Sequence, residues 1–211
     1  MFWKLPEKQS GNFLITGSGS PQLLSTPHPI TIRTYLYMIK KLSLNEAFAR
    51  SAPTVYTVVT SLDVSGKPNA LGVSWVTRTS FEPFLILISI DHSRFSHAGI
   101  RENGEFVVNY PSAIQEKGAW VCGTTSGRDT DKTRTSGLVF IASKKVHAPT
   151  IDGAVAAFEC VVIGEFETGD HTVFIGRVVA ARGDPEEERH LYVTSEFQIF
   201  ALDNTMVGTS E

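Results

Sequence analysis

Arginine, serine and histidine side chains stand at both ends of an apolar run within residues 77–97, TRTSFEPFLILISIDHSRFSH. The run, Phe84-Leu85-Ile86-Leu87-Ile88, has no polar break. Guanidinium groups bind anions through charge-assisted hydrogen bonds, and apolar walls accept flat rings. We therefore expect a buried strand beside a ligand that is apolar at one end and anionic at the other; a core strand between two polar loops is the alternative. The polar residues are Thr77, Arg78, Thr79 and Ser80 before the run, and Ser89, Asp91, His92, Ser93, Arg94, Ser96 and His97 after it.

Two stretches further along the chain also carry residues suited to binding. Ser126, Arg128 and Lys132 fall within SGRDTDK, a string that can contribute to a binding site, although a solvated loop and helix start is the more common structure for it. His171 follows Gly169-Asp170 at an expected hairpin tip. An imidazole there can donate to a ligand or transfer a proton near neutral pH, although a capping or core role is common for a histidine.

Several common site motifs are missing from the sequence. There is no GxGxxG after a strand, no GxxxxGK[ST] and no GxSxG. The 6 histidines show neither HxxxH nor HxH spacing, so no metal site is expected. Cys122 and Cys160 lack CxxC partners, which favours unreactive thiols in a reducing compartment.

Composition limits the class of protein. The chain has 211 residues, 42% of them hydrophobic and 19% charged, so one domain with a sizeable core can form. The net charge of −3 argues against a general nucleic-acid binder. No apolar run is long enough to span a bilayer, and the N-terminus has no secretory apolar region. We therefore expect a cytoplasmic protein without a membrane segment.

The local patterns predict short helices among several antiparallel strands. Capping boxes beginning at Ser43 and Ser112 open two helices, and Gly104 ends a third that runs from Arg94 to Asn103. Asp129 is expected to cap a short helix through Arg134. Strands rich in β-branched residues are expected over 54–61, 70–77, 84–90, 105–110, 139–142, around 146, 154–168, 171–182 and within 191–200. The first two strands form one expected hairpin, and 154–168 with 171–182 forms another.

No regular alternation of strand and helix occurs, so an antiparallel barrel with short helices fits best. Residues 1–42 contain loop-forming runs such as GSGSP and TPHP, and we expect them to be poorly ordered or loosely docked. A second hypothesis is that Met38 is the natural start. The folded domain is expected over 43–205.

Four motifs, in order from about Ser51 to Ala181, resemble the flavin reductase-like family of FMN-binding split barrels, in its flavoredoxin-like branch. They are SAPTVYTVVTSLDVSGKPNALGVSWVTRTSFEP, LISIDHSRFSHAGIRENGEFVVNYPS, SGRDTDKTRTSGL and GDHTVFIGRVV. Residues 1–50 have no counterpart in the family pattern. The resemblance implies a mainly β fold, a six-stranded antiparallel Greek-key split barrel with short peripheral helices. It also implies a homodimer with one FMN per subunit near the interface.

The resemblance further implies a role for each group of residues. Thr77, Arg78, Thr79 and Ser80 correspond to a phosphate-side group, and Ser89, Ile90, Asp91 and His92 would run along the isoalloxazine. Ser93, Arg94, Ser96 and His97 would help to hold the ribityl phosphate. Ser126, Arg128 and Lys132 correspond to a second loop that approaches the cofactor. His171 would lie near the flavin or nicotinamide as the candidate catalytic residue.

The activity implied is that of an NAD(P)H-dependent flavin reductase, which passes electrons through FMN to a flavin or to an acceptor protein. Two other functions stay open from the sequence. One is a flavin-binding electron carrier or storage module without NAD(P)H turnover. The other is a flavin-free barrel that serves as an interaction scaffold.

Overall fold

The computed structural model describes residues 39–187 and 189–202, and every structural statement below refers to these. The expected N-terminal extension lies almost entirely outside the described residues, as does the alternative start at Met38. Within the described part, no helix has the length and apolar character needed to cross a bilayer.

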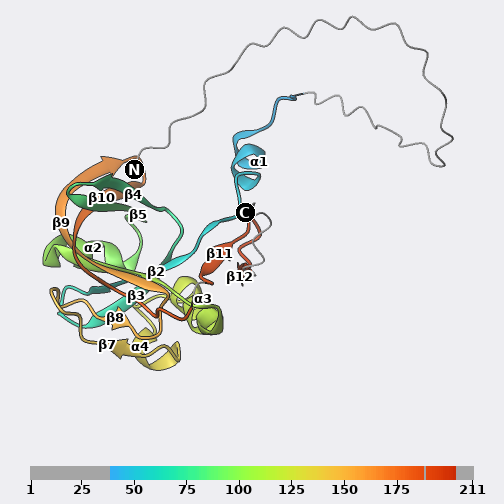
Figure 1. Cartoon of the computed structure of the whole chain (residues 1–211). Helices are drawn as coiled ribbons and strands as arrows, with labels where there is room; N and C mark the ends of the chain where they lie inside the picture. Colours follow the sequence, from blue (N-terminus) through green and yellow to red (C-terminus); the bar gives the residue numbers. More distant parts are fainter. Residues whose placement is uncertain (1–38, 188, 203–211) are drawn as a thin grey trace, which may run out of the picture. The chain divides into compact units, whose positions relative to one another are not determined.

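A seven-stranded antiparallel sheet forms the centre of the fold (Figure 1). Its strand order is β3-β2-β6-β9-β10-β5-β4. Two smaller sheets lie outside it, β1-β11-β12 and β7-β8. The large sheet contains β2 (Thr57–Leu62), β3 (Pro68–Val73), β4 (Val76–Phe81), β5 (Phe84–Asp91), β6 (Glu105–Tyr110), β9 (Ala156–Thr168) and β10 (His171–Arg182). The small sheets contain β1 (Thr54–Val55), β11 (Leu191–Val193), β12 (Ile199–Ala201), β7 (Phe140–Ile141) and β8 (Thr150–Ile151).

The mainly β class with short helices is confirmed, but the six-stranded Greek-key split barrel is not. The sheet has seven strands, and its edge strands β3 and β4 are not paired with each other. The expected strand over 70–77 is divided in two: residues 70–73 belong to β3, which forms the expected hairpin with β2, and residues 76–77 belong to β4. The chain leaves β3 after Val73, and β4 then pairs with β5 rather than with β2. This break at Ser74 and Trp75 carries the chain from one edge of the sheet to the other.

The β9–β10 hairpin is confirmed over nearly its full predicted length. Thr168 pairs with His171 around Gly169, whose φ of 65 lies in the region that glycine adopts without strain. The strand expected at Val146 is absent: that side chain belongs to a small apolar cluster with Val107, Ala148 and Ala157, and β8 comes later, at Thr150–Ile151.

The helices begin largely where the capping patterns place them. They are α1 (Leu44–Ala49), α2 (Phe95–Asn103), the 3-10 turn η1 (Ala113–Gln115), α3 (Glu116–Thr124) and α4 (Lys132–Thr135). Both capping boxes form, at Ser43 and at Ser112, and Gly104 ends α2 with a φ of 66. The cap of α4 is Asp131 and not Asp129, because the Asp131 side chain accepts the N–H of Thr133. Helices α3 and α4 pack on β3, while α2 packs on β2 (Figure 1).

One apolar core joins strands that are distant in the sheet order. It contains Val59, Leu71, Val73, Ile86, Ile88, Ile90, Ile100, Phe106, Val108, Cys160 and Phe174. Strand β5 contributes alternate residues: Ile86, Ile88 and Ile90 are buried, whereas Leu85 and Leu87 are half-buried on the opposite face. The run is therefore one-sided, unlike the fully buried strand that its unbroken apolar sequence predicts.

Two glycines let α3 approach β3 closely. A Cβ on Gly72 would lie 2.8 Å from the Cα of Gly123, and a Cβ on either glycine would overlap the hydroxyl of Tyr56. That hydroxyl donates to the carbonyl of Ala119 at 3.1 Å. The contact sets the height of the α3 C-terminus above β3, and Gly123 itself lines a cavity at this place.

Candidate functional site

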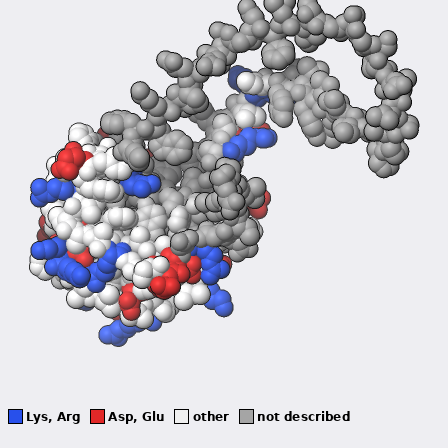
Figure 2. All heavy atoms as spheres, in the orientation of Figure 1, with Lys and Arg blue, Asp and Glu red and all other residues white. Residues whose placement is uncertain are grey.

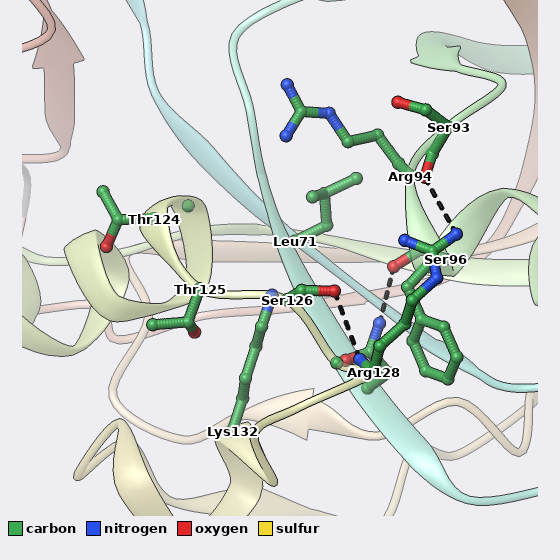
Figure 3. A pocket seen from close by; sticks show the side chains of 13 residues that line it. Leu71, Ser93, Arg94, Ser96, Thr124, Thr125, Ser126, Arg128 and Lys132 are labelled. Atoms are coloured by element: carbon green, nitrogen blue, oxygen red, sulfur yellow. Dashed lines mark hydrogen bonds between the residues drawn. The ribbon is translucent and has the colours of Figure 1, made fainter.

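A cavity of about 360 Å³ opens between β3, the start of α2, and the loop that joins α3 to α4 (Figure 3). Three of its lining residues are cationic, Arg94, Arg128 and Lys132, and none is acidic. Six of the other ten lining residues have hydroxyl or amide side chains. The other lining residues are Asn69, Leu71, Ser93, Phe95, Ser96, Gly123, Thr124, Thr125, Ser126 and Gly127.

The end of β5 positions the N-terminus of α2 at this cavity. The carboxylate of Asp91 accepts the N–H of Ser93 at 2.7 Å, and its carbonyl accepts the N–H of Arg94 at 3.0 Å. Hydrogen bonding with the Ser93 side chain, followed by that with the Ser93 backbone N–H, holds the pKa of Asp91 below its usual range. Arg94 is the N-cap of α2, and its side chain caps no backbone N–H. The positive end of the helix therefore faces the cavity with its arginine free for a ligand.

The loop after α3 brings Arg128 to the rim of the cavity. Its guanidinium donates to the carbonyl of Ser93 at 3.0 Å and lies 5.7 Å from the centroid of the Phe95 ring. The hydroxyl of Ser126 accepts the N–H of Arg128 at 3.2 Å. A Cβ on Gly127 would lie within 2.5 Å of Phe95, so only glycine permits this approach of loop and helix.

Lys132 is the buried cation of the site, with 3% of its surface exposed. Its ammonium donates to the carbonyls of Ala70 at 2.8 Å and Cys122 at 2.9 Å. Burial, and to a lesser degree the charge of Arg94, lowers the pKa of Lys132. Among the described residues no carboxylate pairs with it. An ammonium has three N–H groups, so one remains available for an anion.

Two neighbouring polar side chains hold the wall of the cavity. Asn69 of β3 donates to the hydroxyl of Ser96 at 2.7 Å, and both residues are buried. Sequence reasoning missed Asn69, Leu71, Phe95, Thr124 and Thr125. Only the pairing of β2 with β3 and the packing of α3 bring them to the cavity. No pattern of neighbouring residues in the sequence predicts these long-range contacts.

A second polar cluster surrounds His171, the candidate catalytic residue. His171 pairs with Asp91 across β10 and β5, and its Nδ1 lies 2.6 Å from the carboxylate of Asp170. The ring of Trp75 stacks on the imidazole at 4.6 Å. The sequence analysis did not single out Trp75, although it sits at the break between β3 and β4.

His92 and His97 contact the β9–β10 hairpin rather than the cavity. His92 Nε2 lies 2.7 Å from Glu167, and His97 Nε2 lies 2.8 Å from the hydroxyl of Thr172. Burial, followed by the charge of Arg101, lowers the pKa of His97. Ser89 donates its N–H to the carbonyl of Trp75 at 2.9 Å, and the side chain of Ile90 is buried in the core.

Thr77, Arg78, Thr79 and Ser80 lie on β4 and are not part of the cavity lining. The reason is the direction of β4, which runs antiparallel to β5 and so leads away from α2. Arg78 pairs with Ile86, five positions before Asp91. At about 3.4 Å per residue, this places Arg78 roughly 17 Å along β5 from Asp91. The structure therefore separates this group from Ser93, Arg94, Ser96, Ser126, Arg128 and Lys132, which it brings together.

The cysteines are buried within the part of the chain described. Burial raises the pKa of Cys122 to about 11 and that of Cys160 to about 12, so both are held as thiols at neutral pH. In the same residues no group of three histidine, cysteine or acidic side chains is arranged to hold a metal ion.

The chain belongs to the flavin reductase-like domain family, because the family model for the flavin reductase like domain matches residues 49–201. An NADH-dependent FAD reductase of Streptomyces globisporus is 33% identical over 152 residues, which cover 72% of this chain and 81% of the relative. An uncharacterized protein of Archaeoglobus fulgidus is 43% identical over 127 residues, which cover 59% of this chain and 72% of that protein.

Solved structures agree with the family in fold. An NADH:FAD oxidoreductase of Streptomyces globisporus superposes with a TM-score of 0.67 at 28% identity, covering 76% of this chain and 92% of that one. Flavoredoxin of Desulfovibrio vulgaris gives a TM-score of 0.67 at 22% identity, covering 75% and 91%. The resemblance noted in the four motifs is thus confirmed.

Proposed function

We propose that this chain is an NAD(P)H-dependent flavin reductase that binds FMN and passes electrons to a flavin or to an acceptor protein. The observation that carries the proposal is the buried ammonium of Lys132 in a cavity that also presents Arg94 and Arg128 and no carboxylate. A buried cation without a counter-ion is costly, and a phosphate dianion in the cavity would offset that cost.

The residues present fit a flavin phosphate. Arg94, Arg128 and Lys132 would neutralise its charge, and Ser93, Ser96 and Ser126 offer hydroxyls near the first turn of α2. The ring end would extend toward Ser89, Asp91 and His171. FMN, when bound, would accept a hydride from NAD(P)H and pass the electrons on. The protein's part is to orient the cofactor, exclude water and handle protons at His171.

The relatives support this activity by name. The Streptomyces globisporus relative is called an NADH-dependent FAD reductase, and a relative from Kitasatospora aureofaciens is called a flavin reductase (NADH). A Thermus thermophilus protein of the same fold is titled an FMN-binding protein. Together with family membership, these names favour flavin and nicotinamide as the ligands of this chain.

We also propose a homodimer with the flavin near its interface. The sheet face opposite the core is apolar and partly exposed. Leu87 of β5 pairs with Ile175 of β10. Val173 of β10 pairs with Ser89 of β5 on one side and with Phe166 of β9 on the other. Residues paired across antiparallel strands point to the same face. The exposed fraction of Phe166 is 58%. A second copy of this chain would bury that face and lie next to Ser89 and Asp91.

The finer features of the fold and setting are proposals as well. One core contains residues of β3 and of β5, which are near opposite ends of the sheet order, and this supports a sheet curled into a split barrel. The folded domain is proposed over 43–205, with residues 1–42 as an extension. A cytoplasmic location is proposed as well.

Three substitutions test the phosphate site. We expect Arg94→Ala and Lys132→Met each to weaken FMN binding by about 2 kcal/mol, close to 30-fold, because each removes a charge-assisted bond. Riboflavin, which has no phosphate, should bind nearly as before. Arg78→Ala tests the role of the Thr77–Ser80 group. We expect it to change FMN affinity only slightly, because that group lies apart from the cavity. Titration by flavin fluorescence measures all three, and equal losses for FMN and riboflavin would remove the phosphate role.

The activity itself is tested on the purified protein loaded with FMN. Anaerobic addition of NADH or NADPH should bleach the flavin band, followed by electron transfer to added free flavin. A protein that binds FMN but is reduced by neither nucleotide would instead be an electron carrier or storage module.

A further inference from the structure

We propose that Trp75 is a positioning residue for His171, holding the imidazole so that its Nε2 exchanges a proton with the reactants at the flavin ring. The inference rests on the proposed function, because it assigns a step of that reaction. It adds a residue that none of the four family-like motifs identifies as functional.

Trp75 is itself held in place by contacts with β5 and α1. It lies between β3, which ends at Val73, and β4, which begins at Val76. Its carbonyl accepts the N–H of Ser89 at 2.9 Å, and the edge of the Phe48 ring contacts the indole with centroids 6.2 Å apart. The exposed fraction of Trp75 is nonetheless 45%. The backbone of Trp75 is thus fixed, while its indole is partly open to solvent.

Two contacts together restrict the His171 ring. Trp75 stacks on it with centroids 4.6 Å apart and an interplanar angle of 28°, which fixes the plane of the imidazole. Asp170 lies 2.6 Å from Nδ1, which favours a proton on that nitrogen. Nε2 is then left to accept or donate, and no described residue bonds to it. Only 18% of the side chain is exposed.

The charges around the imidazole come from two elements. Asp170 precedes it in the hairpin, and Asp91 pairs with it from β5. His92 follows Asp91 and donates its backbone N–H to the carbonyl of Asp170 at 3.1 Å. Two carboxylates therefore face one imidazole. A proton taken from solvent can be passed to the reactants through Nε2.

The reaction requires such a proton. Reduction of an oxidised flavin by NAD(P)H consumes one hydride and one proton and yields NAD(P)⁺ and the two-electron reduced flavin. The hydride comes from the nicotinamide, and His171 would supply the proton and regain it from solvent. Trp75 follows Leu71, a cavity residue, by four positions along the chain, roughly 13 Å at full extension. The two clusters are thus close enough to serve one cofactor.

The kinetic test compares three variants of the FMN-loaded protein. Trp75→Leu should leave FMN affinity within about twofold but lower kcat roughly tenfold, a fraction of the usual contribution of acid–base catalysis. It should also shift the pH profile of kcat. Trp75→Phe, which can still stack, should restore most of the rate. Trp120→Leu is the matched control, since Trp120 is 39% exposed on α3 and lies outside the cavity. An unchanged pH profile in Trp75→Leu would overturn the proposal.

A second measurement needs no turnover. The chain has 3 tryptophans, so a Trp3→Phe/Trp120→Phe background leaves Trp75 as the only indole. A protonated imidazole stacked on an indole interacts with its ring and quenches its emission. Emission should therefore rise with pH as His171 loses its proton, and His171→Gln should abolish the change. A pH-independent emission, or a change that survives in His171→Gln, would overturn the stacked arrangement.

The two measurements separate this inference from the proposed function. If the wild-type protein is reduced by neither nucleotide, the flavin reductase proposal fails, whatever the emission shows. If reduction occurs normally and Trp75→Leu alters only FMN affinity, the reductase proposal stands and the positioning role is removed.

Discussion

Lys132 shows how much a single buried charge reveals about a site. A lysine with 3% exposure and only carbonyl partners is rare, because an ammonium in a protein interior usually pairs with a carboxylate. Arg94 adds a second positive charge to the same cavity. The local potential is therefore arranged for an anion rather than for stability of the empty protein.

The protonation of Lys132 gives a pH-dependent prediction. Because burial lowers its pKa, the ammonium is lost at a lower pH than the ordinary value of about 10.4. Only the protonated form attracts phosphate, so FMN affinity should fall as pH rises through the lowered pKa, while riboflavin affinity stays level. Isothermal titration at several pH values measures the effect.

Two variants serve as controls for this pH dependence. Lys132→Arg keeps its charge throughout and should flatten the profile. Lys117→Met, which removes an exposed lysine of α3, should leave the profile as in the wild type. A wild-type affinity that is level to pH 10 would contradict the role of Lys132.

The sequence predicts the charged residues of the site better than the uncharged ones. Arg94, Arg128 and Lys132 stand in polar stretches whose composition reports binding chemistry. Asn69 and Leu71 resemble ordinary strand residues, and only tertiary packing brings them to the cavity. Arg78 is the opposite case: its neighbours suit an anion, but the direction of β4 carries it away from α2.

At the level of elements, two buried carboxylates hold the loop before β8. Glu159 of β9 accepts the N–H groups of Lys144 and Lys145, and the guanidinium of Arg182 bonds to it at 2.9 Å. Glu105 of β6 accepts the N–H groups of His147 and Ala148. The loop has no regular structure of its own, so these carboxylates take the place of ladder hydrogen bonds.

Replacing one carboxylate should therefore destabilise the fold. Glu159→Gln leaves Arg182 without its buried counter-ion and should lower the free energy of unfolding by about 3 kcal/mol. Burial acts to raise the pKa of Glu159, but the bonds from Lys144 and Arg182 outweigh it and the pKa is lowered. The wild-type protein should then lose stability as pH falls through that lowered value, below the usual value of about 4.3.

Urea denaturation between pH 3 and pH 7 measures both effects. The Glu159→Gln variant should lack the part of the stability loss that appears as pH falls. Glu102→Gln, at an exposed position on α2, should behave like the wild type. Equal stability of Glu159→Gln and the wild type at neutral pH would show that the loop is held by other contacts.

Local elements were more predictable than their arrangement. Turn glycines, capping boxes and β-branched runs identify the β9–β10 hairpin, α2 and α3, because the deciding interactions lie within a few residues. The crossing of β4 to β5 and the pairing of β6 with β9 depend on contacts between residues far apart in sequence. No pattern within either strand specifies its partner, which explains the error over 70–77.

At the scale of the whole molecule, surface charge does not indicate a preferred partner. On the face shown in Figure 2, basic and acidic side chains are interspersed among uncharged ones. The net charge is only −3. The apolar sheet face around Phe166 and Ile175 is therefore the better guide to association.

The proposed dimer gives a prediction at this scale. Phe166→Glu places a charge in the interface and should shift the protein from dimer to monomer, as measured by light scattering after size-exclusion chromatography. Phe197→Glu is the control, because Phe197 is 74% exposed and lies between β11 and β12. A wild-type protein that is monomeric at micromolar concentration would contradict the proposed interface.

The cationic cavity also affects how the protein should be handled. Inorganic phosphate and sulfate have the charge and size of the group that Arg94, Arg128 and Lys132 are arranged to bind. Such ions would compete with the cofactor, and by mass action they would stabilise the flavin-free protein. Purification in a phosphate buffer would thus yield a colourless but well-folded sample, whereas a bulky zwitterionic buffer would preserve bound flavin.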